Sequence, residues 1–401
     1  MSAFAGKHIL IIVENLPVPF DRRVWQEAKT LKEQGAEVSV ICPRMKDYTK
    51  SYEVSEGIHI YRHALPIEAS GAFGYLLEYS VALFYEFVLS WKIFFTRRFH
   101  VIQGCNPPDL IFLVALPFKL FGVKYVFDHH DINPELYMAK FNKTGWFYKL
   151  MLLFERCTFM TADYSIATNE SYKEIAVRRG KMKPENVAVV RSGPDTNRIF
   201  LQPPNQSFKK GKTFLVGYVG VIGEQEGLDL LIQSILIIRQ KRDDIQYAII
   251  GGGTHLDFIR QYANDNGVSD IIDFYGRTDD KTMLEVLSTC DVCVNPDVPS
   301  EMNNLSTMNK IMEYMALKKP IVQYDLKEGR YSALDASLYA QNTVVNDFAE
   351  KITMLLDDEM LRETMGKYGY DRLNSQLSWQ KQKLILINLY QKVLNVKSIE
   401  S

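Results

Sequence analysis

The residues best suited to chemistry lie between Asn295 and Val322, where a short apolar strand leads through a polar loop into a helix. The polar residues, most of them at near-helical spacing, are Ser306, Thr307, Asn309, Lys310 and Glu313. The apolar ones form one helical face, made of Met308, Ile311, Met312, Met315 and Ala316. Serine and threonine are favoured N-cap residues, so we predict that the helix opens at Ser306 or Thr307. Its free N–H groups, with a lysine one turn in, can hold a phosphate. An ordinary capped surface helix is the competing interpretation.

Other polar or glycine-rich clusters also follow predicted strands. They are His129 to Asp131, Gly193 to Asp195, Gly220 to Gly227, Gly251 to Gly253, and Arg277. In open α/β sheets, ligands bind beyond the carboxyl ends of the strands. The shared position of these clusters therefore separates them from scattered surface polarity and indicates binding sites.

Each cluster has a functional and a structural interpretation. His130 can hydrogen-bond a substrate hydroxyl or shuttle a proton near neutral pH, or it can simply hold its loop. Gly220, Gly223 and Gly252 permit close approach of a ligand to the backbone, or they form tight turns. Arg277 can pair with a phosphate or stack on a base, or it can be a solvated loop arginine. The residues alone leave these alternatives open.

Two series of alternating strands and helices must position these clusters. The first begins with the strand Ile9 to Val13 and a helix capped by Asp21, and the second begins at Phe214 after the polar linker 201–212. We therefore predict an α/β protein with two Rossmann-like, doubly wound domains that face each other across a cleft. The predicted domains are 1–200 and 201–378. The helix in 379–401 is expected to return to the first domain.

The length, net charge and composition are those of an ordinary globular protein. It has 401 residues and a formal net charge of -1, which gives no bulk electrostatic argument for nucleic acid as a partner. Its 5 cysteines are scattered, and the lone pair Cys290 and Cys293 is too little for a zinc site. The N-terminal apolar run reads straight into a strand rather than into a cleavable signal. We expect a cytoplasmic protein with reduced thiols.

The most hydrophobic stretch is Tyr75 to Phe95. Glu78 and Glu86 interrupt it, so we predict an amphipathic helix rather than a membrane span. One interpretation is a helix half-buried against the sheet. The other is contact of residues 75–98 with the cytoplasmic face of a membrane, helped by Trp91, Lys92, Arg97 and Arg98.

The chain resembles the family 4 (group 1) retaining glycosyltransferases, which share the two-domain GT-B fold. The resemblance is carried by FDRRVWQEAKTLKEQGAEVSVICP, FDHHDINPELY, GYVGVIGEQEGLDLLIQSI, IIGGG, FYGR and STMNKIMEYMALKKPIV, in this order. It implies that His130 lies near the donor sugar and that Gly220 and Gly223 lie under the diphosphate. It also implies that Arg277 contacts the nucleobase and that Glu313 holds the ribose hydroxyls. By the same resemblance, the domain 1–200 is expected to bind the acceptor and the domain 201–378 the nucleotide sugar.

The sequence departs from the family pattern at the diphosphate. Val221 and Glu226 stand where the family commonly has arginine and lysine, and Leu305 replaces the first of its paired glutamates. Lys318 replaces a glycine after the helix. We hypothesise that Lys310 takes over the missing cationic role, with N–H groups from Ser306 to Asn309 and with Arg277 as second partner.

The resemblance implies transfer of a hexosyl or N-acetylhexosaminyl group from a nucleotide sugar, a UDP-sugar, to a glycan or lipid-linked acceptor in surface polysaccharide synthesis. Retention of the anomeric configuration would proceed by attack of the acceptor on the same face. No D-x-D motif appears, so we expect no cofactor and no essential metal. The alternatives are a nucleotide-sugar epimerase of the same fold and a catalytically silent sugar-nucleotide-binding subunit.

Overall fold

The computed structural model divides the chain into two compact units, which are residues 1–192 with 382–401 and residues 193–381. It describes residues 3–45, 47–65, 71–141 and 143–396, with the side chains of 71–78 and 140 excepted. None of the helices in this part of the chain combines the length and the apolarity that a membrane crossing requires. Each unit is described separately below.

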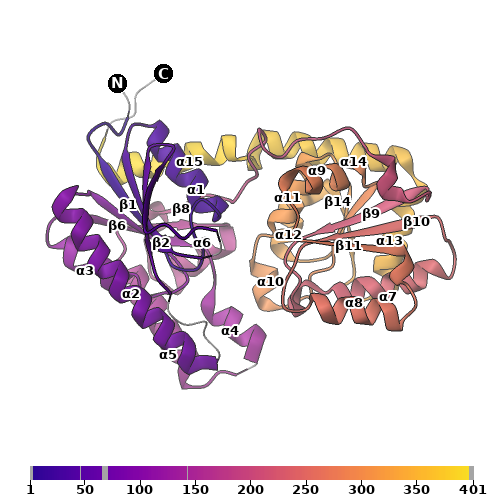
Figure 1. Ribbon diagram of the computed structural model, residues 1–401, viewed down its shortest axis with the longest axis horizontal. Coiled ribbons are helices and arrows are strands. Elements are labelled where there is room, and N and C mark those ends of the chain that lie inside the picture. Colours follow the sequence, from indigo (N-terminus) through magenta and orange to yellow (C-terminus); the bar gives the residue numbers. More distant parts are fainter. Residues whose placement is uncertain (1–2, 46, 66–70, 142, 397–401) are drawn as a thin grey trace. The chain divides into compact units, whose positions relative to one another are not determined.

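Unit 1 is built on an eight-stranded sheet in the order β3-β4-β2-β1-β5-β6-β7-β8 (Figure 1). Its strands are β1 His8–Val13, β2 Glu37–Pro43, β3 Tyr52–Ser55, β4 Ile58–His63, β5 Val101–Cys105, β6 Lys124–His129, β7 Tyr164–Ala167 and β8 Val187–Val189. All neighbours are parallel except β3, which pairs antiparallel with the edge of β4. The strands β1, β2 and β5 are almost entirely buried because both faces of the sheet are covered.

The helices of unit 1 are α1 Arg22–Glu33, α2 Gly71–Thr96, α3 Phe112–Lys119, α4 Asn133–Phe141, α5 Trp146–Thr161, α6 Glu170–Arg178 and most of α15 Trp379–Leu394. Helix α1 begins as predicted, since the Asp21 carboxylate accepts the backbone N–H of Val24 at 3.0 Å. In α15, the Tyr390 hydroxyl donates to Gln103 of β5, and its ring lies 6.4 Å from that of Phe4. The C-terminal helix therefore packs on the first sheet, as expected.

Unit 2 has a six-stranded, wholly parallel sheet in the order β11-β10-β9-β12-β13-β14. Its strands are β9 Phe214–Val219, β10 Ile245–Ile250, β11 Ile272–Gly276, β12 Val292–Asn295, β13 Ile321–Tyr324 and β14 Ser337–Ala340. The predicted start of the second series at Phe214 is confirmed, and both sheets are of the Rossmann-like type.

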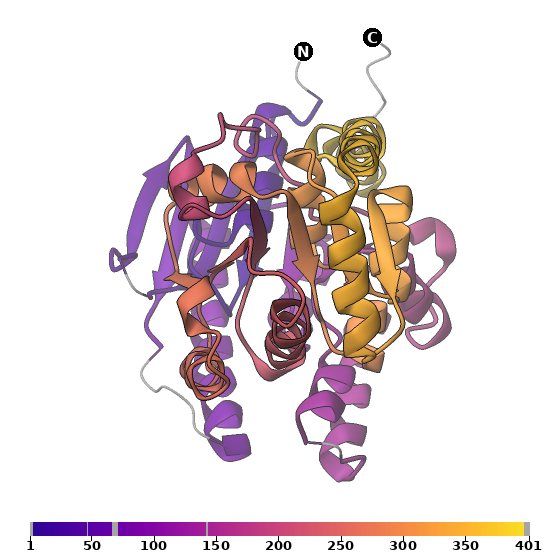
Figure 2. The same ribbon diagram turned by 90° about the vertical axis from the view of Figure 1, so that its right-hand side faces the viewer.

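The helices of unit 2 are α7 Leu228–Arg239, α8 Leu256–Asp265, α9 Asp280–Thr289, α10 Glu301–Leu305, α11 Asn309–Ala316, α12 Lys327–Ala333, α13 Val345–Asp357 and α14 Glu359–Arg372. They form layers on both faces of the sheet (Figure 2). One apolar core joins α7, α8 and α13 to the strands, and a second joins α9 and α11 to the opposite face. The sheet is thereby buried on both sides.

Two boundaries differ from the sequence prediction. The units divide at Ser192 rather than at residue 200, because Ile199 is buried in the core of unit 2 and Arg198 forms an ion pair with Asp280 there. The prediction that one helix opens at Ser306 or Thr307 is wrong. Helix α10 ends at Leu305, and α11 begins at Asn309 without a side-chain cap, since Ser306 is extended (φ -96°, ψ 139°).

Helix α2 turns its polar residues inward. Ala82, Glu86 and Ser90 have no exposed surface, whereas Phe84 is 65% exposed and Phe95 is 78% exposed. The predicted stripe is therefore real in this part of the helix, but it faces the sheet instead of water. The side chain of Glu78 lies outside the described residues.

Candidate functional site

The glycine-rich loops of unit 2 pack directly against one another at the carboxyl ends of β9 and β10. A Cβ atom at Gly251, where φ is +139°, would lie 1.8 Å from the carbonyl oxygen of Gly220. A Cβ atom at Gly253 would lie 2.2 Å from the carbonyl oxygen of Ile222. No larger residue fits either position, so these glycines are required for the approach of the two loops and leave an exposed backbone surface.

Lys310 lies beneath this glycine surface. Its Cε would be 3.1 Å from a Cβ atom at Gly220, and its Nζ donates to the Asp297 carboxylate at 2.8 Å. The ammonium also lies 4.8 Å from the ring centre of Tyr218. Lys310 is 9% exposed and Asp297 is 1% exposed, so this is a buried ion pair. Burial alone lowers the pKa of Lys310, but Asp297 and its other neighbours raise it above the ordinary value.

The two residues that replace the family's cations in the loop after β9 have different environments. Glu226, where the family has lysine, folds back and accepts the backbone N–H of Gly223 at 2.9 Å. Burial raises the pKa of Glu226 above its ordinary value. Val221, where the family has arginine, is 58% exposed. Glu226 therefore stabilises the turn itself, and neither residue supplies positive charge to a phosphate.

Arg277 is the exposed cation beside the glycines. Its side chain lies over Gly252, where a Cβ atom would be 3.2 Å from Cγ and 3.3 Å from Nε. No ion-pair partner of Arg277 is found among the described residues. Of the two cations, Arg277 is therefore the exposed one, and Lys310 is the one held in a buried ion pair.

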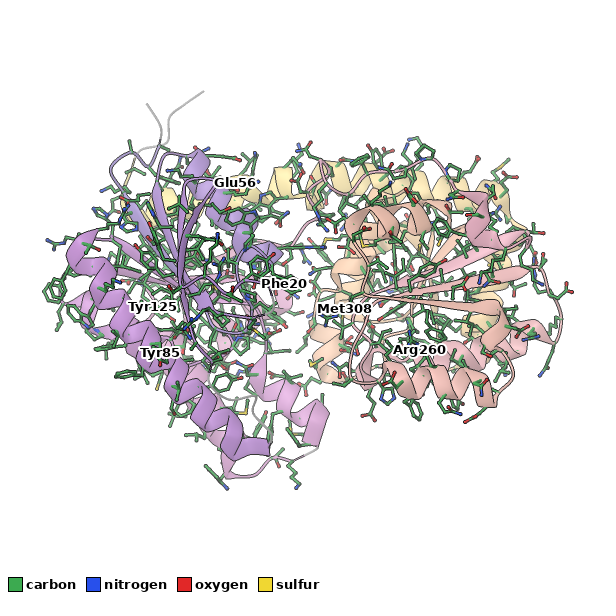
Figure 3. The ribbon with its side chains drawn as sticks, in the orientation of Figure 1. Phe20, Glu56, Tyr85, Tyr125, Arg260 and Met308 are labelled. Carbon is green, nitrogen blue, oxygen red and sulfur yellow. The ribbon has the colours of Figure 1, made fainter. Side chains whose placement is uncertain are left out.

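The other predicted donor residues lie on or before α11. Asn309 is exposed at the first position of the helix, and Glu313 is half-buried one turn further on, close enough to Arg198 to raise the pKa of that guanidinium. Ser306 and Thr307 lie in the extended linker before the helix, near Met308 (Figure 3). Both residues therefore precede α11, but they do not cap it.

In unit 1, His130 follows β6 and is hydrogen-bonded on two sides. Its ring N–H at Nε2 donates to the Asp128 carboxylate at 2.7 Å, and its backbone N–H donates to the Asn106 side chain at 2.6 Å. The ring is 11% exposed. Burial on its own lowers the pKa of His130, but the neighbouring carboxylate outweighs it and the net pKa is raised.

Asp128 is the centre of a buried network that the sequence did not reveal. Its carboxylate accepts from Arg23 and from Gln103, each at 2.9 Å, in addition to His130. Burial, followed by the charge of Asp128, raises the pKa of Glu27 to about 8, so Glu27 is protonated near neutral pH. The pKa of Asp128 is lowered despite its burial, because Arg23 and His130 stabilise its charge. The network therefore orients the His130 ring and fixes its charge.

The adjacent His129 has a different environment. It is fully buried among the rings of Phe127, Phe159 and Tyr172, and burial lowers its pKa to about 3. His129 is a neutral core residue, so the choice of His130 as the candidate is consistent with the geometry.

An apolar cavity of about 100 Å³ opens beside the Asn106 loop. Its walls are mostly apolar side chains of α2, of the loop after β5 and of the inner face of α5, namely Tyr79, Pro107, Pro108, Phe147, Leu150 and Phe154. Asp109 and Asn133, which hydrogen-bond each other at 2.7 Å, form its polar end. Since Asn106 also holds the His130 backbone, the cavity and the histidine belong to one loop system.

One group of side chains in unit 1 has the geometry of a metal site. The ligand atoms of Cys105, Asp128 and His130 lie within 4.8 Å of one another. However, burial raises the pKa of the Cys105 thiol well above its ordinary value, and Arg23 already neutralises Asp128. The prediction that no metal is essential stays a prediction.

Four residues of these two centres received no role from the sequence: Arg23, Asp128, Tyr218 and Asp297. Asp128 and Asp297 each lie at or directly beyond the end of a strand, and this position in the sequence could have identified them as candidate site residues. The sequence contains no comparable signal for Arg23 and Tyr218, because their partners lie 105 and 92 residues away.

Comparisons with known families identify the chain. Residues 202–372 match the family described as Glycosyl transferases group 1, and residues 21–193 match the Glycosyl transferase 4-like domain. The chain therefore belongs to the group 1 (family 4) glycosyltransferases of the GT-B fold, as the sequence resemblance indicated.

Three similar proteins illustrate this membership. The chain is 27% identical over 266 residues to the capsular polysaccharide biosynthesis glycosyltransferase CapM of Staphylococcus aureus, covering 59% of this chain and 64% of CapM. It is similar to sucrose-phosphate synthase from Thermosynechococcus elongatus, with a TM-score of 0.78, 18% identity and coverage of 97% and 99%. It is also similar to HepE of Anabaena in complex with UDP and glucose, with a TM-score of 0.72, 13% identity and coverage of 98% and 100%.

The similar structures show that the fold is shared. The chain spans less than two thirds of the length of the curated relatives it matches. The comparisons give no support to an epimerase or to a silent subunit.

Proposed function

We propose that this protein is a retaining glycosyltransferase that moves a sugar from a UDP-sugar to a lipid-linked glycan acceptor in surface polysaccharide synthesis. The observation that carries the proposal is the exposed glycine surface of unit 2, with Arg277 over it and Lys310 beneath it. Backbone N–H groups and a free guanidinium together suit a diphosphate, because both donate hydrogen bonds to its oxygens.

Catalysis by this site would act mainly on the leaving group. Glycosyl transfer develops positive charge at the anomeric carbon and negative charge on the departing diphosphate. Donors that are already in place for that negative charge lower the barrier. Arg277 is proposed to supply one such donor, since the N–H groups of Gly220 and Gly223 are already bonded to Ile250 and Glu226. Retention follows if the acceptor attacks on the same face while the leaving phosphate takes its proton.

The remaining candidate residues receive supporting roles. Glu313, a carboxylate that can accept two hydroxyl hydrogen bonds, is proposed to hold the ribose. His130, fixed by Asp128, is proposed to hydrogen-bond a hydroxyl of the donor sugar. Lys310 is proposed to set the potential beneath the diphosphate, with its charge shared between Asp297 and the ligand.

The identity of the donor nucleotide rests on chemical fit and on one relative. HepE of Anabaena, whose fold this chain shares, binds UDP and glucose. Arg277 can stack on a planar base as well as pair with phosphate, and it lies at the edge of the glycine surface. We therefore choose UDP over other nucleotides.

A lipid-linked acceptor agrees with the apolar cavity beside the Asn106 loop. The first units of a lipid chain would bury apolar surface against walls such as Phe147 and Phe154. CapM, a relative, is named for capsular polysaccharide biosynthesis, a process in which we place this protein too. Contact of residues 75–98 with a membrane surface would bring such an acceptor within reach.

A panel of nucleotides and nucleotide sugars tests the donor by thermal shift. Ligands that bind the native state raise the apparent stability by mass action, so UDP and one UDP-sugar should give the largest shifts. Larger shifts with GDP or ADP compounds would reject the donor assignment. Turnover is then followed by NMR with and without a lipid-linked acceptor. Conversion of the donor alone would indicate an epimerase instead.

The same assay tests the role of metal ions. We expect full activity in EDTA, since the leaving-group charge is met by Arg277 and backbone N–H groups. Loss of activity that magnesium restores would contradict this expectation.

A further inference from the structure

We propose that unit 2 carries a second binding site, which takes a phosphate group, at the amino ends of β9 and β10. The site is a cavity of about 160 Å³, which we call the amino-end cavity. Its polar lining consists of Lys212, Arg239, Arg242, Asp243, Tyr247 and Asp270. The glycine loops of the candidate donor site follow the carboxyl ends of the same two strands, which lie side by side (Figure 1). The amino-end cavity is therefore separate from the donor site, and the proposal does not depend on that site.

The hydroxyl of Tyr247 is the observation that carries the proposal. Tyr247 is 2% exposed, and its hydroxyl has no hydrogen-bond partner among the described residues. Burial raises the pKa of Tyr247, and the charges of Arg242 and Asp244 also act on it, so the hydroxyl points toward the turn between α7 and β10. This turn lines the amino-end cavity. A buried hydroxyl without a partner costs free energy, which a group bound in the cavity can recover.

The cations around the cavity keep N–H groups that no acceptor in the described part of the chain uses. Lys212 donates to the carbonyl oxygen of Asp243 and keeps its other ammonium hydrogens. Arg242 donates through Nε and Nη2 to Asp244 and through Nη1 to Asp357, which leaves one hydrogen on each Nη atom. The cavity is therefore rich in donors, so the ligand that fits it is rich in acceptors.

The charges around the cavity favour an anion. Asp270 accepts two hydrogen bonds from Arg239, and Asp244 accepts two from Arg242, so these carboxylates are engaged by the arginines. Lys212 has no carboxylate within ion-pair distance among the described residues. Its ammonium therefore gives the cavity a positive charge that a bound anion can neutralise.

A phosphate group suits these donors better than water does. Its oxygens point in several directions, so one phosphate can accept from Lys212, Arg242 and Tyr247 together. Hydrogen bonds between a cation and a phosphate are also stronger than those between neutral groups. Water would satisfy the hydroxyl of Tyr247 but would leave the charge of Lys212 without a counter-ion.

A second cavity adjoins the first. It has a volume of about 380 Å³ and shares the side chains of Ile238 and Arg242 with the amino-end cavity. Polar side chains of α13, among them Asn346 and Thr353, line it. The phosphate group can therefore come from inorganic phosphate, or from a small phosphate ester whose organic part lies in the second cavity.

Thermal unfolding of the full chain in inorganic phosphate tests the proposal. Phosphate should raise the unfolding midpoint by mass action, and sodium chloride of the same ionic strength should not. The variant Arg277→Ala should show the same rise, because the amino-end cavity does not contain Arg277. A rise that disappears in Arg277→Ala would place the phosphate at the donor site and overturn the proposal.

Three variants change the affinity in different directions. Lys212→Ala should weaken phosphate binding at least about tenfold, since it removes a charge-assisted hydrogen bond. Tyr247→Phe should weaken binding several-fold, but its unfolding midpoint without phosphate should not fall, because the hydroxyl that it removes is unpaired. Asp243→Asn should tighten binding about threefold, because the exposed Asp243 is the lining carboxylate that no arginine engages.

Matched controls lie elsewhere on unit 2. Lys281→Ala and Asp257→Asn change side chains that are 84% and 99% exposed and do not line the cavity. Both controls should bind phosphate like the unchanged protein. The proposal is overturned if phosphate raises the midpoint no more than sodium chloride does, or if Tyr247→Phe binds phosphate as tightly as the unchanged protein.

A comparison of inorganic phosphate with glucose 1-phosphate identifies the source of the phosphate group. Tighter binding of glucose 1-phosphate, weakened by Lys212→Ala, would support a small ester, and tighter binding of inorganic phosphate would support the free ion. Failure of the proposed function is recognised separately, since a protein that binds phosphate through Lys212 but shows no thermal shift with UDP would keep this site and lose the donor site.

Discussion

Each unit buries a cation against an aspartate beside its candidate site, but the two aspartates differ in how many hydrogen-bond donors they have. In unit 1, Asp128 accepts hydrogen bonds from Arg23, Gln103 and His130 at 2.9, 2.9 and 2.7 Å. In unit 2, one oxygen of Asp297 accepts from Lys310 at 2.8 Å, while the other is buried and has no partner among the described residues.

The difference teaches what each centre can do before a ligand arrives. A carboxylate with all its partners holds its neighbours in one geometry, so His130 is oriented in advance. A buried oxygen without a donor costs free energy, and a ligand hydroxyl or an added water can recover it. The comparison therefore predicts that changes at Asp128 act mainly on stability and orientation, and that changes around Asp297 act more on the response to the donor.

The largest effect is expected for Asp128→Asn. Arg23 would keep only Glu27, at 3.1 Å, as a buried carboxylate partner, and His130 would lose its charged acceptor, which should lower the free energy of unfolding by about 4 kcal/mol. Because the folded-state pKa of Asp128 is lowered, the contribution is complete above the ordinary pKa of an aspartate and is lost only as the pH falls below it. Urea unfolding at pH 7 and at acid pH measures both.

The control for this prediction is Asp270→Asn, which removes an exposed ion pair with Arg239 in unit 2 and should cost less than about 1 kcal/mol. The pKa of His130, followed by NMR, should also fall in Asp128→Asn. An unchanged His130 pKa would show that the carboxylate does not fix its charge.

The second effect concerns Lys310→Ala, for which the hypothesis that Lys310 replaces the missing cation leads us to expect a change in the donor kinetics alone. The buried pair changes that expectation, because Asp297 would be left charged and unpaired, at about 3 kcal/mol in stability. The double variant Lys310→Met, Asp297→Asn removes both charges and should restore most of the stability. If it also restores the donor KM, Lys310 has no electrostatic role in binding.

Arg277→Ala separates binding from stability. An exposed arginine without an ion-pair partner contributes little to folding, so the free energy of unfolding should change by less than about 0.5 kcal/mol. Removing one donor to a developing anion should lower kcat/KM by about 100-fold. Arg260→Ala on α8, also a surface arginine of unit 2 (Figure 3), is the matched control and should leave kcat/KM unchanged. A similar loss in both variants would contradict the assignment.

Glu86 extends the comparison to a carboxyl group with neither cation nor hydrogen bond. Burial, with a smaller contribution from Glu14, raises the pKa of Glu86 to about 8. A raised pKa means that stability is complete below the ordinary pKa of a glutamate and falls as the pH rises toward 8. Glu86→Gln should therefore raise the free energy of unfolding by roughly 2 kcal/mol at pH 8 and hardly at all at pH 4.5.

The exposed Glu363 on α14 gives the matched control for this experiment, since Glu363→Gln should show no such pH dependence. Parallel unfolding curves for Glu86→Gln and the unchanged protein at both pH values would show that Glu86 is hydrated or paired in solution.

The sequence predicted the elements well where local signals agree. Helix α7, Leu228–Arg239, shows such agreement, because a continuous apolar segment there lies between a glycine and a polar loop. Asp21 was recognised as the cap of α1 for a similarly local reason. The start of α11 was misjudged, because Ser306 and Thr307 have good capping side chains in a segment that the preceding helix α10 keeps extended.

By itself the sequence determined the two Rossmann-like sheets, the family and the loops that carry the candidate residues, since periodicity, caps and glycine positions are local properties. Only the tertiary structure decided which charges are free. Lys310 appeared to be an available cation until Asp297, 13 residues away, was found against it, and Asp128 gained its role from Arg23, 105 residues away. The direction in which α2 turns its polar stripe was likewise decided by packing, because a helical repeat gives the spacing of a face but not the partner it meets.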